Sequence, residues 1–166
     1  PLQFGRLVLV FEDGAGFITH HHLLPRAQGD KDVVVAQTRI VQQRLEGRIQ
    51  RASFDRGFHS PQNQQELAEI VTNVCLPKPG KKQAAEQESA AGVEFQQARQ
   101  NHPGVESAIG ALQSGNGLER CRDRTELGYE RYLALGMLGR NLHTLGRLLI
   151  AAEHPLSEAA KTRRVA

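Results

Sequence analysis

Apolar positions near the start of the chain predict a β-hairpin followed by a helix. Two apolar runs, at 7–11 and 17–24, are separated by an Asp-Gly turn, which is a typical hairpin signal. Asp32 suits a helix cap, and apolar residues then recur at helical spacing as far as Leu45. Gly47 is expected to end this helix.

The middle of the chain predicts a strand, a helix and a second strand. Residues 48–54 form the first candidate strand. Ser60 and Pro61 suit the start of a helix to about Glu69, because proline is favoured in the first turn. Residues 71–76 form the other candidate strand, and a proline-rich segment follows it.

The second half of the chain is expected to be helical. Residues 81–100 are rich in Gln, Ala and Glu without an apolar stripe, which indicates a polar surface helix or a mobile segment. Apolar residues around Glu106 predict a half-buried helix, and a Gly-rich break at 114–117 ends it. A long helix rich in leucine is then predicted from Glu126 to about Glu153.

This order of elements predicts an α/β fold with a mixed sheet, flanking helices and a long C-terminal helix. We expect one domain over residues 1–152 and a basic, mobile tail over 153–166. The chain begins at Pro1 and enters a strand pattern at once, which is typical of a fragment or a processed chain.

Composition narrows the class of protein. The 166 residues contain no apolar run long enough to cross a membrane and no secretory leader pattern, so no membrane partner is expected. Cys75 and Cys121 lack CxxC spacing and are interpreted as reduced thiols of a cytoplasmic protein.

The net charge of +3 is modest, but the cations are grouped. Three groups favour a polyanionic partner over solvated surface alone, and they lie at 78–82, 120–124 and 161–164.

Two carboxylates have settings that suit metal binding. Asp55 ends a candidate strand, and Glu106 lies in the first turns of a predicted helix. Acids that converge from such positions can hold Mg²⁺, which prefers oxygen ligands. Simpler interpretations are an ion pair of Asp55 with Arg51 or Arg56, or a turn role, and an exposed Glu106 favoured by the helix dipole.

Histidines supply further candidates for a site. Strand alternation places the middle residue of the run His20, His21 and His22 on the opposite face, which favours a structural role over a metal cluster. His102 lies one helical turn before Glu106 and is a candidate DNA or metal-shell contact, or equally a capping residue.

Several blocks in fixed order resemble the DDE transposases of bacterial insertion sequences, and the similarity extends from residue 7 to about 149. They are SFDRGFHSPQN at 53–63, LPKPGK at 76–81, HPGVESAI at 102–109, GLERCRD at 117–123, RYLALG at 131–136 and NLHTLG at 141–146.

The resemblance implies the C-terminal part of a ribonuclease H-like catalytic domain that lacks its first strand. Asp55 and Glu106 would be catalytic acids and ligands of Mg²⁺ or Mn²⁺, for cutting and joining DNA at transposon ends and target. The first acid of the family is expected upstream of Pro1, and Asp13, in a hairpin turn, is a poor substitute. The chain alone is therefore expected to be inactive, and its parent to be bacterial, cytoplasmic and a homo-oligomer in the active complex.

Basic residues near these blocks are candidate DNA contacts in such a recombination reaction. Many relatives have Tyr and Arg before the Glu and a Lys after it, whereas this chain has Arg99, His102 and Gln113 there. The candidate contacts are Arg56, His59, Lys78, Lys81, His102, Arg120, Arg140 and Arg147.

Two alternatives stay open on the sequence. One is a catalytically dead remnant or regulator of the mobile element, which binds DNA or the full-length transposase. The other is a different ribonuclease H-like nuclease, which acts on junctions or hybrids.

Overall fold

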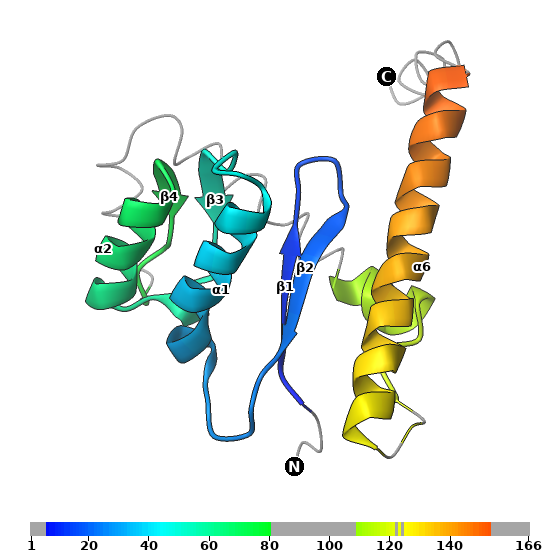
Figure 1. The fold of residues 1–166 in the computed structure, drawn as a ribbon, viewed down its shortest axis with the longest axis horizontal. Helices are drawn as coiled ribbons and strands as arrows, with labels where there is room; N and C mark the ends of the chain where they lie inside the picture. The colour runs from blue at the N-terminus through cyan, green and yellow to red at the C-terminus, as the bar shows by residue number, and fades with distance from the viewer. Residues whose placement is uncertain (1–5, 81–108, 122, 124, 154–166) are drawn as a thin grey trace. The chain divides into compact units, whose positions relative to one another are not determined.

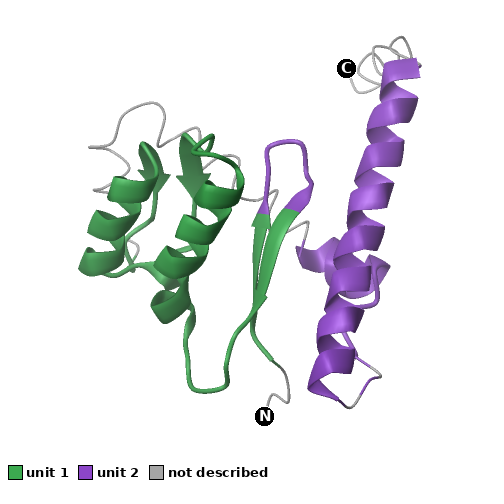
Figure 2. Cartoon of the chain, viewed as in Figure 1, with its two compact units in different colours: residues 1–11, 19–107 green, residues 12–18, 108–166 purple. Residues whose placement is uncertain are grey.

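The computed structural model describes residues 6–80, 109–121, 123 and 125–153 (Figure 1). These residues fall into two compact units (Figure 2). The first unit contains the described residues of 1–11 and 19–107, and the second contains those of 12–18 and 108–166.

The predicted hairpin is confirmed as strands β1 (Val8–Glu12) and β2 (Ile18–Leu23). Its turn is closed by Asp13, whose Oδ1 accepts hydrogen bonds of 2.9 Å from the N–H groups of both Ala15 and Phe17. Gly16 has a φ of +90°, which disfavours any residue with a Cβ atom. Asp13 and Gly16 therefore allow the tight turn that connects the two strands.

Helix α1 (Asp30–Arg44) begins three positions earlier than predicted, because Asp32 was the expected cap. The N-cap residue is Gly29, and Asp32 accepts a 2.9 Å hydrogen bond from the Gly29 N–H through its side chain. The Asp32 carboxylate, inside the first turn, thus accepts the hydrogen bond of the N-cap N–H group. This contact is one half of a capping box. Gly47, with a φ of +77°, follows the helix as predicted.

Strands β3 (Arg51–Ser53) and β4 (Asn73–Cys75) are parallel and shorter than predicted. They pair Arg51 with Asn73 and Ser53 with Cys75. Helix α2 (Pro61–Ile70) connects them, and its Ser60 cap accepts a 3.0 Å hydrogen bond from the Asn63 N–H. The predicted proline start of this helix is confirmed.

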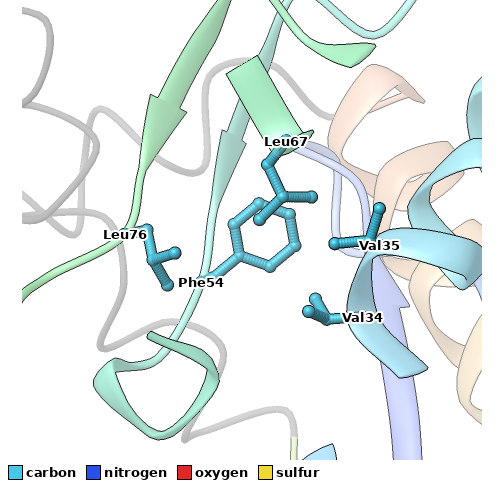
Figure 3. Close-up of a cluster of buried hydrophobic side chains, with 5 residues drawn as sticks. All are labelled: Val34, Val35, Phe54, Leu67 and Leu76. Carbon is cyan, nitrogen blue, oxygen red and sulfur yellow. The ribbon is translucent and has the colours of Figure 1, made fainter. Parts of the chain in front are cut away.

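A cluster of buried side chains joins α1 and α2 to this strand pair (Figure 3). Phe54 directly follows β3 and is 6% exposed, while Leu67 and Leu76 are fully buried. Burial of each such side chain contributes roughly 1.5–3 kcal/mol. The cluster consists of Val34, Val35, Phe54, Leu67 and Leu76.

The second unit is built on the long helix α6 (Glu126–Glu153), whose predicted bounds are confirmed. The segment before it contains a π-helical turn, η2 (Ala111–Gly115). The Leu118 side chain lies 2.5 Å from where a Cβ atom of Gly136 would be, so this segment fits against the helix only because residue 136 is glycine. The Tyr132 hydroxyl also donates a 2.6 Å hydrogen bond to the Gly117 carbonyl.

The hairpin turn binds to α6 through side chains of the helix. The Ile18 N–H donates to Asn141 Oδ1 at 2.7 Å, and Asn141 Nδ2 donates to the Ile18 carbonyl at 2.9 Å. The buried Thr144 hydroxyl donates to the Gly16 carbonyl at 3.3 Å. Asn141 therefore satisfies both backbone groups of Ile18, as a neighbouring strand would.

The fold is α/β with small sheets and a long C-terminal helix, as predicted. The expected single mixed sheet is not seen in the described residues, where the strands form two separate two-stranded sheets. Strands β3 and β4 have only three residues each, so this pair relies on the apolar cluster that α1 and α2 form beside it. No helix in the described part of the chain is both long and apolar enough to span a membrane.

We expect the Asn141→Ala substitution to lower the free energy of unfolding by about 1–3 kcal/mol, because it leaves two backbone groups of Ile18 unpaired. Chemical denaturation followed by circular dichroism would measure the change. His143→Ala, at an exposed position of the same helix, is the matched control. Equal stability of the two variants would contradict this role of Asn141.

Candidate functional site

The candidate site lies at the carboxyl edge of the parallel strands β3 and β4. Because these strands run in the same direction, the residues that follow them meet at one edge of the sheet, where open α/β folds bind ligands. Asp55 follows β3, and Lys78 follows β4. Helix α2 also begins at this edge. We define the carboxyl-edge site as Lys31, Asp55, Arg56, His59 and Lys78.

Asp55 is exposed and held in one orientation by local geometry. Its Oδ1 accepts a 2.7 Å hydrogen bond from the Arg56 N–H and caps the short 3₁₀ helix η1 (Arg56–Phe58). The preceding Phe54 is buried, and its N–H donates to the Cys75 carbonyl at 2.8 Å. Asp55 therefore has the turn role that was one of its simpler interpretations, and it uses only Oδ1 for this role. Its Oδ2 receives no hydrogen bond from the described residues.

Gly57 is the middle residue of the short helix η1, directly beyond Asp55 and Arg56. Its φ is not among the positive values in the described chain, and η1 has a conformation that other residues adopt. A Cβ atom at position 57 would lie 3.9 Å from Asp55 Oδ2. The glycine therefore leaves the space beside this oxygen open.

Asn63 is a positioning residue that the sequence did not reveal. It is 7% exposed, and its Nδ2 donates hydrogen bonds of 2.9 Å to the carbonyls of both Lys31 and Phe58. The side chain thereby ties the start of α1 and the end of η1 to the first turn of α2. A polar residue in the first turn of a proline-started helix was the available signal, but its partners are distant in sequence.

His59 lies in a positive environment. Burial lowers its pKa below the ordinary value of 6.5, and the nearby charges of Lys78 and Lys31 lower it further. The two lysine contributions place positive charge from separate elements near this imidazole. An anionic ligand would find its charge balanced here by side chains from three separate elements.

The Asn63→Ala substitution should destabilise the first unit by about 1–3 kcal/mol, because two buried carbonyls lose their donor. Denaturation of this variant beside Gln65→Ala, an exposed change on the same helix, would measure the effect. A fall no larger than that of the control would show that Asn63 does not tie these elements together.

An NMR titration should give His59 a pKa below 6.5, and Lys78→Gln should raise that pKa by removing a neighbouring cation. The unfolded chain then binds more protons than the folded one as pH falls below about 6.5, so stability decreases towards acid pH. Arg48→Gln, which removes a cation paired with Glu46 at 2.8 Å, is the control and should leave His59 unchanged. A pKa of 6.5 or higher would contradict the positive environment.

His20 is engaged as a structural residue. Arg44 Nη1 donates to its Nδ1 at 3.1 Å, and its Nε2 lies 2.8 Å from Gln37 Oε1. Because arginine can only donate, Nδ1 accepts and the proton is on Nε2. Both ring nitrogens are thus occupied, which supports the structural interpretation of this histidine. No group of three metal-ligating side chains occurs within the described ranges.

The remaining predicted site residues are not gathered at the carboxyl edge by any described contact. Arg140 faces Glu12 at 3.9 Å, and burial raises the pKa of this glutamate more than the Arg140 charge lowers it. Arg120 and Arg147 are exposed, and their DNA contacts stay predictions. The predicted residues outside the described part of the chain are Lys81, His102 and Glu106.

No protein-family model, curated protein or solved structure matches this chain.

Proposed function

We propose that the chain is the C-terminal part of a DDE transposase catalytic domain with a ribonuclease H-like fold, and that its carboxyl-edge site acts on DNA phosphates. The observation that carries the proposal is the position of Asp55, which ends a parallel strand with one carboxylate oxygen open. This is the placement that the sequence blocks around residues 53–63 and 102–109 imply for a catalytic acid.

Asp55 and Glu106 are the proposed ligands of Mg²⁺ or Mn²⁺. The donor chemistry fits, because both are carboxylates and Asp55 is exposed with an uncommitted oxygen. A bound divalent ion would supply charge stabilisation for displacement at phosphorus. The part played by the chain is to hold Asp55 through the η1 cap and the buried Phe54, so that the carboxylate needs little reorganisation.

Cations beside Asp55 are the proposed contacts of the DNA backbone. Lys31 lies in the first turn of α1, Arg56 lies in η1, and Lys78 follows β4. Burial and the charges of Lys78 and Lys31 lower the pKa of His59 in the free protein, and a nearby phosphate would favour its protonated form. Such contacts position a nucleic acid without reading its sequence.

Titration with Mn²⁺, followed by electron paramagnetic resonance, tests the metal ligands. Asp55→Asn and Glu106→Gln should each weaken binding at least about tenfold, since each removes a charged oxygen ligand. Glu69→Gln, an exposed change on α2, is the matched control. Binding that is equal in all the variants would overturn the assignment of these two acids.

DNA binding tests the cationic contacts separately. Lys78→Ala should weaken binding to a DNA duplex and lower the salt dependence of affinity by about one phosphate contact, whereas Arg48→Ala removes an equal charge elsewhere and should do neither. Fluorescence anisotropy at several salt concentrations measures both quantities. Equal losses for the two variants would indicate a general charge effect and contradict a site at Lys78.

A non-catalytic DNA-binding regulator is the second candidate, which the exposed cations of the same edge favour. DNA binding that needs no metal and is unchanged by Glu106→Gln would support it over the transposase proposal. A nicking assay on supercoiled DNA with Mg²⁺ adds a further test. Cleavage by the wild-type chain but not by Asp55→Asn would contradict the expectation that the chain alone is inactive.

A further inference from the structure

Glu12 and Arg140 form a poorly satisfied pair of charges in the second unit. Glu12 Oε1 and Arg140 Nη2 lie 3.9 Å apart, which is too long for a hydrogen bond. Both side chains are largely buried, with 13% of Glu12 and 22% of Arg140 exposed. Glu12 Oε2 and Arg140 Nε are also buried, and neither has a hydrogen-bond partner among the described residues. Each charge has thus left water without gaining a full set of partners.

A pair with this geometry is poorly suited to stabilising the fold. Buried charges stabilise a protein only where close contact and further hydrogen bonds offset the loss of hydration. Burial raises the pKa of Glu12 more than the charge of Arg140 lowers it, and the charge of Asp13 raises it as well. The attraction of Arg140 therefore does not offset the cost of keeping Glu12 ionised.

The hairpin turn fixes where Glu12 lies relative to Arg140. Glu12 is the last residue of β1 and directly precedes the turn. The turn is bound to α6 by the two hydrogen bonds between Ile18 and Asn141, which is the residue after Arg140. A Cβ atom at Gly16 would lie 3.3 Å from Glu12 Oε1, so the glycine leaves room for the carboxylate. The turn contacts thus hold an acid beside this arginine.

We propose that Glu12 restrains Arg140 in the free chain, and that a DNA phosphate takes the place of Glu12 when nucleic acid binds. The inference rests on the proposed function, because that function supplies the polyanion. A guanidinium group offers N–H donors in a planar fork, and a phosphate can accept two of them at once, which Glu12 does not do. Glu12 is therefore an internal competitor of DNA, and the sequence blocks of the family resemblance do not include it.

Other residues on the same side of α6 favour a polyanion as the competing partner. His143 and Arg147 follow Arg140 at about one and two helical turns, and both are exposed. Once Arg140 is free of Glu12, it forms a row with Arg147 that suits a phosphate backbone. The Glu12 carboxylate opposes such binding for as long as it stays beside Arg140.

Fluorescence anisotropy of the chain with a labelled DNA duplex tests this exchange. Glu12→Gln should tighten binding at least about threefold, because it removes the competing charge and keeps the shape of the side chain. Arg140→Gln should weaken binding, and Glu12→Gln should then have no further effect on that background. Glu130→Gln, an exposed change on the same helix, is the matched control for the loss of a negative charge.

Two binding results would overturn the proposal. One is a gain for Glu12→Gln no larger than that of the control, and the other is an equal gain with and without Arg140. Chemical denaturation gives an independent readout, in which Glu12→Gln should be at least as stable as the wild type, since no hydrogen bond is lost. A lower denaturation midpoint would instead identify a structural ion pair and contradict the exchange.

The Lys78→Ala variant separates this inference from the carboxyl-edge site. If Lys78→Ala binds DNA as the wild type does while Glu12 and Arg140 remain coupled, the carboxyl-edge site fails and the exchange stands. If Lys78→Ala weakens binding while Glu12→Gln changes nothing, only the exchange is overturned.

Discussion

The parallel pairing of β3 with β4 is the constraint on which the candidate site depends. The pair has few ladder hydrogen bonds, so it is held by the apolar cluster that α1 and α2 form around Phe54. Because Phe54 is adjacent to Asp55, the packing that fixes the strand also fixes the acid. Loss of that packing would release the Asp55 carboxylate together with Arg56 and Lys78, since these residues follow the paired strands.

Charges of both signs at the carboxyl edge are the basis of the proposed function. Burial lowers the pKa of His59 and the charges of Lys78 and Lys31 lower it further, while Asp55 keeps one oxygen open towards the same edge of the sheet. An isolated protein has to tolerate this accumulation of positive charge, and a bound polyanion would relieve it. A divalent ion at Asp55 would add to the attraction for phosphate.

Helix α6 illustrates a different use of apolar surface. One face binds the hairpin turn, where Asn141 satisfies both backbone groups of Ile18 and Gly136 admits the side chain of Leu118. The other face carries exposed leucines, which stabilise nothing within the described part of the second unit. A helix of this kind is stable in its own unit and still has free energy of burial available for association.

The sequence alone determined the local elements, because turn and cap signals act over a few residues. Asp13 closes the hairpin, Gly47 follows α1, and Ser60 with Pro61 starts α2, all as predicted. It also identified Asp55 as a strand-end acid. Only the tertiary structure decided that the strands form two separate pairs, that Asn63 ties the edge together, and which leucines of α6 are buried. Each of these depends on partners far away in the chain, and a local pattern of apolar and polar residues contains no information about such partners.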